Sequence, residues 1–347
     1  MALEAAFEKR LGNFHLKVNL SSQEEFLGIL GASGCGKSMM LKCIAGIEKP
    51  DSGYITLDGR VLFDAKRHIN LPPQKRHVGY LFQNYALFPN MTVRQNILCA
   101  LWGEKDQKKR KEEAERMISL LQLEQVAHLR PAQISGGQAQ RAALGRILVN
   151  APQLLMLDEP FSALDTYLRL RLQMELKDIL RSYGKGIIMV THDRDEAFRM
   201  CERIGVMEGG RMLCVKGTKE LFADPASTAA ATLTGCKNIV PAVKSGTCEV
   251  FVPSWGIHLK TRSEVKEGLK AIGIRAHYFH PTAGQNVFPV RVIREMEEPF
   301  EWVTEFRYEE QGEDNPAIWW RYSKEKRPAK PPKALGVSGA NILLLYE

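Results

Sequence analysis

Continuous apolar runs predict four strands that are buried on both faces. They occupy residues 26–30, 78–82, 154–157 and 187–190, and each run ends in glycine or in polar residues. Strands of this kind belong to parallel sheets whose faces are covered by helices. Helical periodicity in residues 39–45 and 135–148, and in the charged segment that ends near Leu180, supplies such helices. The pattern therefore predicts an α/β domain.

Other segments alternate between apolar and polar positions, which predicts strands with one solvated face. Residues 14–20 alternate in this way, and residues 54–57 and 60–63 flank Asp58-Gly59, a sequence typical of a type I′ hairpin turn. Residues 201–215 predict a second hairpin. From residue 92 the chain is helical and densely charged, which predicts a helical insert with a solvated face over about residues 92–150.

The pattern changes after residue 235. Small residues at 226–234 predict a linker or a terminal helix, and beyond them short alternating segments recur between turn residues, at 248–252, 269–274 and 287–292. Such spacing is typical of a small β-barrel or sandwich. We therefore predict two domains, residues 1–235 and 236–347, which suits a chain of 347 residues.

Composition narrows the classes of protein that fit. No run of eighteen apolar residues occurs, and acids stand in the first ten residues where a signal peptide needs an apolar core, so we expect a chain that neither spans nor crosses a membrane. Seven cysteines without a C-x-x-C pair argue against a disulfide framework and a zinc site, and they suit a reducing cytosol. The net charge of +8 is dispersed, which favours a solvated basic surface over a nucleic-acid site.

The residues after the first buried strand fit the G-x-x-x-x-G-K-[ST] pattern of a phosphate-binding loop. They are Gly31, Ala32, Ser33, Gly34, Cys35, Gly36, Lys37 and Ser38. The glycines let backbone N–H groups close around phosphate, and the helix N-terminus adds the positive end of its dipole. Lys37 supplies a mobile cation, and Ser38 offers a hydroxyl to Mg²⁺. Triphosphate is the ligand that uses all of these features.

A serine at the start of a helix predicts a second anion site. Ser135 is a favoured N-cap residue, and Gly136, Gly137 and Gln138 follow it. We expect the two glycines to leave backbone N–H groups exposed at the positive end of the helix. A capped helix without any ligand is the plainer interpretation of so short a string, and both stay open at this point.

Polar side chains follow the last two buried strands. Asp158 and Glu159 come after residues 154–157, at the edge where open α/β sheets bind ligands. Asp158 would face Mg²⁺ through water, and Glu159 would act as general base on an attacking water. His192 follows residues 187–190, where a neutral imidazole could donate to a γ-phosphate oxygen or simply cap the strand.

These elements, in this order, resemble the ATP-binding subunit of an ABC importer. Six motifs carry the resemblance: residues 31–38 match Walker A, Gln83 the Q-loop, 134–138 the LSGGQ signature, 154–159 Walker B, 162–165 the D-loop and His192 the switch histidine. They cover residues 1 to about 215. The resemblance implies a P-loop NTPase fold of the ABC type, with ATP and Mg²⁺ as cofactors, and assigns the C-terminal part to a small TOBE-like or OB-like β-barrel.

The resemblance also implies roles for single residues. Two chains would pair head to tail, with the signature of one chain at the γ-phosphate held by Lys37 of the other. The residues that would contact this shared nucleotide from the signature and the D-loop are Ser135, Gly136, Gly137, Gln138 and Asp165. Ser38, Gln83 and Asp158 would hold Mg²⁺. The catalytic set would be Glu159 as base, with His192 and Gln83.

The partners that the resemblance implies lie at a membrane. They are transmembrane permease subunits, a substrate-binding protein that acts through them, and a second copy of the ATPase chain, with no nucleic acid. The protein would lie peripherally on the cytoplasmic face of the inner membrane. Three positions depart from the family pattern: Ile134 replaces leucine, Met39 replaces threonine, and Leu11 stands where an aromatic residue usually stacks on adenine. Phe14 is a possible substitute, although its alternating strand favours a core position.

The solute is inferred from looser similarity. Residues 11–16, 57–64, 71–80 and 234–238 resemble the ATPase of a molybdate importer, and the C-terminal segment resembles the domain that senses oxyanions or forms dimers there. Sulfate, tungstate or another solute is the first alternative. A soluble ABC ATPase that acts on nucleic acid is the second, supported only by the positive charge. The C-terminal part would be a sensor or a dimer module.

Overall fold

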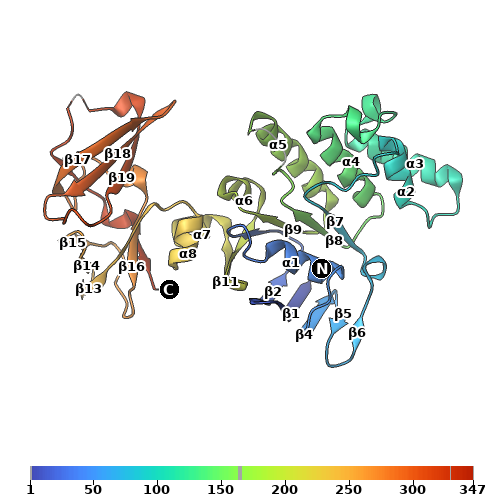
Figure 1. Cartoon of the computed structure of the whole chain (residues 1–347), viewed down its shortest axis with the longest axis horizontal. Coiled ribbons are helices and arrows are strands. Elements are labelled where there is room, and N and C mark those ends of the chain that lie inside the picture. The colour runs from blue at the N-terminus through green and yellow to red at the C-terminus, as the bar shows by residue number, and fades with distance from the viewer. Residues whose placement is uncertain (1, 163–165, 329, 347) are drawn as a thin grey trace. The chain divides into compact units, whose positions relative to one another are not determined.

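The computed structural model describes residues 2–162, 166–328 and 330–346. It divides into two compact units, Met1–Thr218 and Lys219–Glu347 (Figure 1). The first unit holds an 11-stranded sheet, and the second holds three small sheets. Each unit has a separate hydrophobic core, which is the usual reason for a chain of this length to fold in two parts.

Five parallel strands form one half of the large sheet. The apolar runs predict four of them, and the fifth lies within the predicted hairpin at residues 201–215. In spatial order they are β10 (Arg203–Glu208), β3 (Phe26–Leu30), β9 (Gly186–Thr191), β8 (Leu154–Asp158) and β7 (Val78–Leu81). Every residue of β3, β8 and β9 is buried, which explains the absence of alternation there. The register pairs Leu30 with Thr191 and Asp158 with Val190, so the carboxyl ends of these strands meet at one edge.

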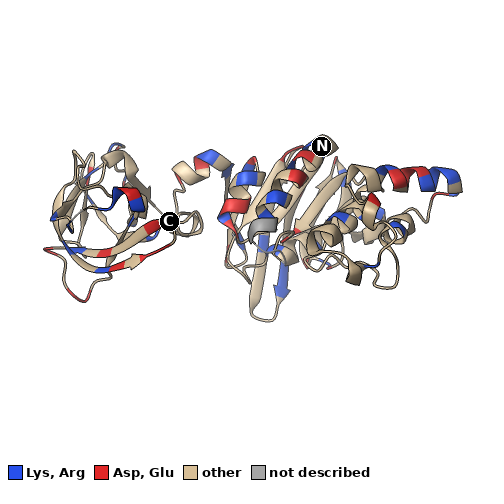
Figure 2. Cartoon of the chain, turned by 90° about the horizontal axis from the view of Figure 1, so that it is seen from above, with Lys and Arg blue, Asp and Glu red and all other residues tan. Residues whose placement is uncertain are grey.

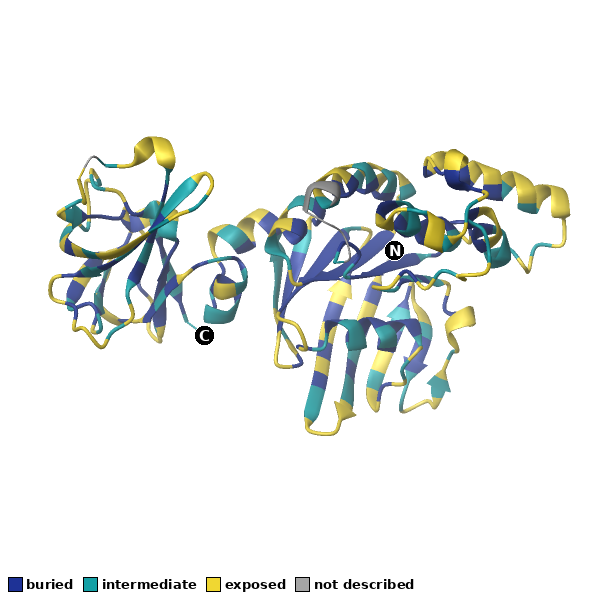
Figure 3. Ribbon diagram, turned by 45° about the horizontal axis from the view of Figure 1, so that its top comes forward, coloured by how far each residue is buried: buried dark blue, intermediate teal, exposed yellow. Residues whose placement is uncertain are grey.

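The other half of the sheet is mainly antiparallel and has one solvated face (Figure 3). Its strands are β6 (Ile69–Asn70), β5 (Arg60–Asp64), β4 (Ser52–Leu57), β1 (Leu3–Leu11), β2 (Phe14–Ser22) and β11 (Arg211–Gly217). Asp58 and Gly59 have φ values of 51° and 74°, which confirms the predicted I′ geometry between β4 and β5. Strand β1 was not predicted, although Leu3, Ala5 and Phe7 alternate with less buried positions.

Helices cover the sheet and extend beyond its β7 edge (Figure 1). The helices of the first unit are α1 (Lys37–Ala45), α2 (Val93–Ala100), α3 (Gln107–Leu120), α4 (Gly136–Leu148), α5 (Thr166–Tyr183) and α6 (Arg194–Met200). Met40, Leu41 and Ile44 of α1 are fully buried in the core that both halves of the sheet share. Among the described helices, none combines the length and apolar content that crossing a membrane requires.

The helical insert has a solvated charged face, as its composition predicts. Figure 2 shows the positions of basic and acidic residues interleaved along α3, the helix at the far right. Surface ion pairs such as Arg94 with Glu115 and Arg116 with Glu113 join these charges. Pairs this exposed contribute little stability, so the buried side of α3, with Ala114, Met117 and Ile118, holds it in place.

The second unit opens with helices α7 (Thr218–Ala223) and α8 (Thr228–Leu233) and continues as three sheets. The first sheet contains β12 (Asn238–Pro241), β16 (Ala271–Ile274) and β21 (Ile342–Leu345), and the second contains β13 (Val243–Gly246), β14 (Glu249–Val252) and β15 (Ile257–Lys260). The third contains β19 (Ile318–Ser323), β18 (Glu301–Tyr308), β17 (Phe288–Glu297) and β20 (Ala334–Leu335). One core joins all three sheets, through residues such as Val250, Ile272 and Trp320.

Short 3₁₀ turns occur in both units. They span Pro73–Lys75, Glu124–Val126, Pro131–Gln133, Ala276–Tyr278, Lys324–Lys326 and Gly339–Asn341.

The division between the units falls after Thr218, earlier than the expected boundary at residue 235. The guanidinium of Arg275 donates to the carbonyl oxygens of Thr234, at 2.5 Å, and Phe222, at 2.6 Å. Ala231 of α8 is fully buried and belongs to a small apolar cluster with residues of the C-terminal sheets. Because these long-range contacts outweigh the linker-like composition of residues 226–234, α7 and α8 belong to the second unit.

Candidate functional site

The phosphate-binding loop follows β3 and leads into α1 in a conformation that requires glycine. Gly34 and Gly36 have φ values of 80° and 107°, in the region that favours glycine. A Cβ at Gly31 would collide with the carbonyl oxygen of Met207. Gly36 is the N-cap of α1 and provides no side-chain cap, so N–H groups of the first turn remain available to an anion.

Lys37 is enclosed by the loop that precedes it. Its side chain is 4% exposed, and its Nζ donates to the carbonyl oxygens of Gly31 at 2.9 Å and Ala32 at 3.0 Å. The same Nζ lies 3.8 Å from Oε1 of Glu159. The ammonium group therefore stands between the phosphate loop and the carboxylate that follows β8.

A hydrogen bond joins the two motifs that the sequence separates by 120 positions. The Ser38 hydroxyl donates to Oδ1 of Asp158 at 2.7 Å, and the Tyr80 hydroxyl donates to Oδ2 at 2.8 Å. Asp158 is the last residue of β8 and is 5% exposed. The parallel pairing of β7 with β8 carries the Tyr80 side chain to this carboxylate.

These groups line a cleft that suits Mg²⁺. The cleft has a volume of about 550 Å³ and is lined by Ser38, Lys42, Phe82, Gln83, Asn84, Asp158 and Ser162. Hydroxyl, amide and carboxylate oxygens are the ligands that Mg²⁺ prefers, and phosphate and water normally complete its shell. The described residues contain no group of three His, Cys, Asp or Glu side chains placed to share a metal ion. A site built largely on substrate phosphates needs no such group.

Glu159 and His192, the two residues that the sequence predicts to act together in catalysis, lie next to each other. Nδ1 of His192 lies 3.2 Å from Oε2 of Glu159, and Glu159 is 15% exposed whereas His192 is 51% exposed. Glu159 has a φ of 45°, rare for a residue with a Cβ, and its N–H donates to the Val190 carbonyl oxygen at 3.1 Å. This conformation turns the carboxylate from the end of β8 toward Lys37 and His192.

The signature segment forms a complete capping box at the start of α4. The Ser135 hydroxyl accepts from the Gln138 N–H at 3.3 Å, and the Gln138 side-chain oxygen accepts from the Ser135 N–H at 2.9 Å. Gly136 is exposed, but Gly137 is buried, and a Cβ there would lie 2.6 Å from Cδ1 of Leu172. Leu172 of α5 therefore covers the Cβ side of the second glycine, and the expected exposure of the two backbone N–H groups stays a prediction.

The described part of the chain shows no hydrogen bond or ion pair between residues 135–138 and the phosphate loop. Ser38, Gln83, Asp158, Glu159 and His192 gather around the loop, whereas Ser135 stands exposed on another part of the unit. Asp165, the predicted D-loop contact, lies outside the described residues. Its role and those of the signature residues stay predictions.

The two candidates for the adenine contact differ in their surroundings. Leu11 ends β1 and is 39% exposed. Phe14 is half-buried against the core cluster, and Cζ of its ring would lie 3.0 Å from a Cβ on Gly36. Phe14 thus combines the predicted core packing with a position beside the phosphate loop.

Sequence reasoning missed two side chains that hold this site. Tyr80 fits the pattern of an apolar strand, and this pattern gives no indication of its contact with Asp158. Arg76 is fully buried, and its guanidinium donates to the carbonyl oxygens of Cys43 at 2.9 Å and Ile44 at 2.8 Å, in the last turn of α1. Burial lowers the pKa of Arg76 to about 10. Its position two residues before β7 gave no signal of this contact, since arginines in loops are usually solvated.

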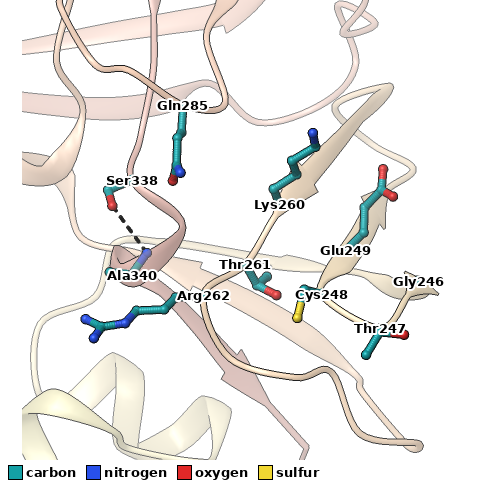
Figure 4. A pocket seen from close by; sticks show the side chains of 10 residues that line it. All are labelled: Gly246, Thr247, Cys248, Glu249, Lys260, Thr261, Arg262, Gln285, Ser338 and Ala340. Atoms are coloured by element: carbon teal, nitrogen blue, oxygen red, sulfur yellow. Dashed lines mark hydrogen bonds between the residues drawn. The ribbon is translucent and has the colours of Figure 1, made fainter.

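A second hollow lies in the C-terminal unit and is lined by other chemistry. Its volume is about 650 Å³, and its lining includes Lys260, Arg262, Thr261 and Glu249. Figure 4 shows the ends of Lys260 and Arg262 pointing to different sides rather than toward one point. Glu249 is paired with His258 at 3.2 Å. We assign no ligand to this hollow.

Comparisons with known proteins match the first unit most strongly. A family model described as ABC transporter matches residues 13–162. The chain is 41% identical over 271 residues to the spermidine/putrescine import ATP-binding protein PotA of Oleidesulfovibrio alaskensis. This match covers 74% of this chain and 70% of the relative. It is 45% identical over 272 residues to the PotA protein of Bacillus cereus, covering 76% of this chain and 79% of the relative.

Solved structures show the same fold over about two thirds of the chain. A bacterial ABC transporter cassette solved as a dimer is 29% identical, with a TM-score of 0.53, and the match covers 63% of this chain and 99% of that one. The cbiO1 protein from Clostridium perfringens, part of the ABC transporter complex cbiONQ, is 26% identical, with a TM-score of 0.57 and coverage of 65% and 91%.

Proposed function

Because the chain belongs to the ABC transporter family, as the ATP-binding and ATP-hydrolysing subunit of an importer, we propose that the cleft beside the phosphate loop is its Mg·ATP site. The observation that carries this proposal is the 2.7 Å hydrogen bond from Ser38 to Asp158, which unites the phosphate loop with the carboxylates after β8. Ser38, Asp158 and Gln83 would hold Mg²⁺. When bound, the metal ion neutralises charge on the phosphates.

Different residues of this chain have different roles in ATP hydrolysis. The loop N–H groups and Lys37 bind and orient the phosphates. Glu159 accepts a proton from the attacking water, and His192, 3.2 Å away, orients that carboxylate and the γ-phosphate. The ammonium group of Lys37 lies 3.8 Å from Oε1 of the same carboxylate.

We propose that a second copy of the chain completes the site. Ser135 and Gly136 are exposed at the N-terminus of α4, where a phosphate of a nucleotide held elsewhere can reach the backbone N–H groups. The D-loop with Asp165 would lie at the same junction. A related bacterial cassette was solved as a dimer, which supports a head-to-tail pair for this chain.

Exposed aromatic side chains support a contact with membrane subunits. Trp102, after α2, is 83% exposed, and Phe88, five residues after Gln83, is 48% exposed with the Arg146 guanidinium 5.2 Å from its ring centre. Large exposed aromatics of this kind are enriched at protein interfaces. We propose that this surface receives a permease subunit on the cytoplasmic face of the membrane, and that no nucleic acid is bound.

The solute that we propose first is a polyamine. The relatives named above are spermidine/putrescine import proteins, and their similarity extends over about three quarters of this chain. Molybdate, which the resemblance of residues 11–16, 57–64, 71–80 and 234–238 favours, stays a prediction, with sulfate or tungstate next. The TOBE-like assignment of the C-terminal sheets, as a sensor or dimer module, is likewise a proposal.

Solute-stimulated hydrolysis tests this function. The chain would be reconstituted in proteoliposomes with its membrane subunits and binding protein, and ATP hydrolysis would be measured with spermidine, molybdate or sulfate. We expect spermidine to raise the rate above the solute-free rate. Stimulation by molybdate alone would replace the polyamine with the oxyanion, and no stimulation by any solute would contradict the importer role.

A further inference from the structure

Among the residues that the structure describes, the Tyr80 hydroxyl has one hydrogen-bond partner, the Walker B carboxylate of Asp158. It donates to Oδ2 of Asp158 at 2.8 Å, while the Ser38 hydroxyl takes Oδ1 at 2.7 Å. Asp158 is 5% exposed, so little water competes for either oxygen. The two hydroxyls therefore hold the carboxylate from opposite sides and leave it a single orientation.

The position of the Tyr80 ring fixes the direction of its hydroxyl. The ring packs against Phe82, with centroids 4.5 Å apart, which limits its rotation. From this position the phenol O–H donates to the carboxylate of Asp158.

The orientation of the Asp158 carboxylate matters for metal binding, because Ser38 can offer its oxygen to a metal only while its hydroxyl proton is donated to another group. Its proton is directed to Oδ1 of Asp158, which leaves the Ser38 lone pairs facing the cleft. Groups that orient metal-binding carboxylates are known to affect metal affinity by about 10-fold to 100-fold when removed. We propose that Tyr80 is a positioning residue that holds Asp158 in the orientation in which Asp158 and Ser38 bind Mg²⁺.

The same contact connects two parts of the cleft. Tyr80 lies on β7, three residues before Gln83, and β7 is the edge strand of the sheet, paired with β8 alone. A displacement of the segment that carries Gln83 is therefore transmitted to Asp158 through a hydrogen bond as well as through the β7–β8 ladder. This inference rests on the proposed Mg²⁺ site.

The variant Tyr80→Phe tests it, because only the hydroxyl is removed. In the full-length protein, Mg²⁺ would be titrated against the binding of a fluorescent ATP analogue, and binding without metal would be measured separately. We expect the half-saturating Mg²⁺ concentration to rise about 10-fold, with metal-free nucleotide affinity within about twofold of the unmodified protein. Thermal unfolding would show whether the fold is intact.

Tyr85→Phe is the matched control. The Tyr85 hydroxyl is also buried but donates to the carbonyl oxygen of Pro160 at 3.3 Å, so its removal should leave the Mg²⁺ titration unchanged. In an Asp158→Asn background, Tyr80→Phe should not raise the half-saturating Mg²⁺ concentration any further, since its effect passes through the carboxylate.

Two results would overturn different parts of this account. If Asp158→Asn weakens the response to Mg²⁺ but Tyr80→Phe does not, the role of Tyr80 is wrong and the metal site stands. If Asp158→Asn itself leaves the titration unchanged, the proposed metal site is wrong. Equal losses in Tyr80→Phe and Tyr85→Phe would reduce Tyr80 to a general packing role.

Discussion

Glu159 depends on a backbone conformation that few residues other than glycine adopt. Its φ of 45° directs the carboxylate toward Lys37 and His192, and its N–H remains bonded to Val190 of β9. Residues held in this way usually occur where function needs a side chain in one place. The position after a buried strand was enough to predict that Glu159 matters, but not which groups it contacts.

The substitution Glu159→Gln should separate binding from hydrolysis. The amide has nearly the same shape, so Lys37 and the phosphate loop should bind ATP with affinity close to that of the unmodified protein. Because an amide cannot accept the proton of the attacking water, turnover should fall about 100-fold or more. Equilibrium ATP binding and steady-state hydrolysis measure the two effects.

Glu208→Gln is a suitable control for this experiment. Glu208 ends the parallel strand β10 at the same edge of the sheet, but it is exposed. Its replacement should leave turnover unchanged. Turnover of Glu159→Gln within about fivefold of the unmodified rate would remove Glu159 from the role of general base.

At the scale of elements, α1 is held at its C-terminal end by a residue distant in sequence. Its N-terminus opens on the phosphate loop, and Arg76 binds the carbonyl oxygens of its last turn. A cation at a helix C-terminus complements the helix dipole. Because the Arg76 guanidinium is buried, it depends on the carbonyl oxygens as hydrogen-bond partners. Arg76 also precedes β7, so the segment that carries Tyr80 and Gln83 is attached to the helix that carries Lys37 and Ser38.

Substitutions at two helix N-caps can separate the effect of a cap on stability from its effect on ATP turnover. Ser135 and Thr92 each form a capping box, with Gln138 and Gln95 respectively. Ser135→Ala and Thr92→Ala should each lower the free energy of unfolding by about 1 kcal/mol. Only Ser135→Ala should also reduce ATP turnover, since only Ser135 is proposed to reach a nucleotide.

Denaturant unfolding and ATP hydrolysis measured on both variants provide this comparison. An equal loss of turnover in Thr92→Ala and Ser135→Ala would mean that the cap acts through stability alone. The expected role of the signature in phosphate binding would then be contradicted.

At the scale of the whole molecule, the residues placed around the phosphate loop do not include the signature segment of the same chain. A second copy is the proposed source of that segment. The Glu159→Gln variant should therefore pair when Mg²⁺ and ATP are present, because the bound nucleotide persists when it is not hydrolysed. Its mass by sedimentation should rise from 39.1 kDa to twice that value.

The matched condition is the same variant with ATP and a chelator in place of Mg²⁺, in which we expect the monomer. Pairing should also weaken in Ser135→Ala combined with Glu159→Gln. If Glu159→Gln remains a monomer with saturating Mg·ATP, the proposal that two copies share each nucleotide is wrong.

Features that depend on neighbouring residues follow from the amino-acid order alone. Apolar runs located the buried strands, Asp58-Gly59 predicted a turn with two positive φ values, and the loop before Lys37 predicted phosphate binding, since each rests on backbone preferences within a few positions. The order of the motifs then indicated the family.

Contacts between distant segments become visible only in the folded chain. Strand pairing brought Tyr80 to Asp158, a buried guanidinium joined Arg76 to α1, helix packing buried Gly137 under Leu172, and Arg275 attached residue 234 to the second unit. These contacts depend on sheet order and register, which periodicity does not specify. A tyrosine in an apolar strand or an arginine in a loop has the same local pattern whether or not it holds a functional group in place.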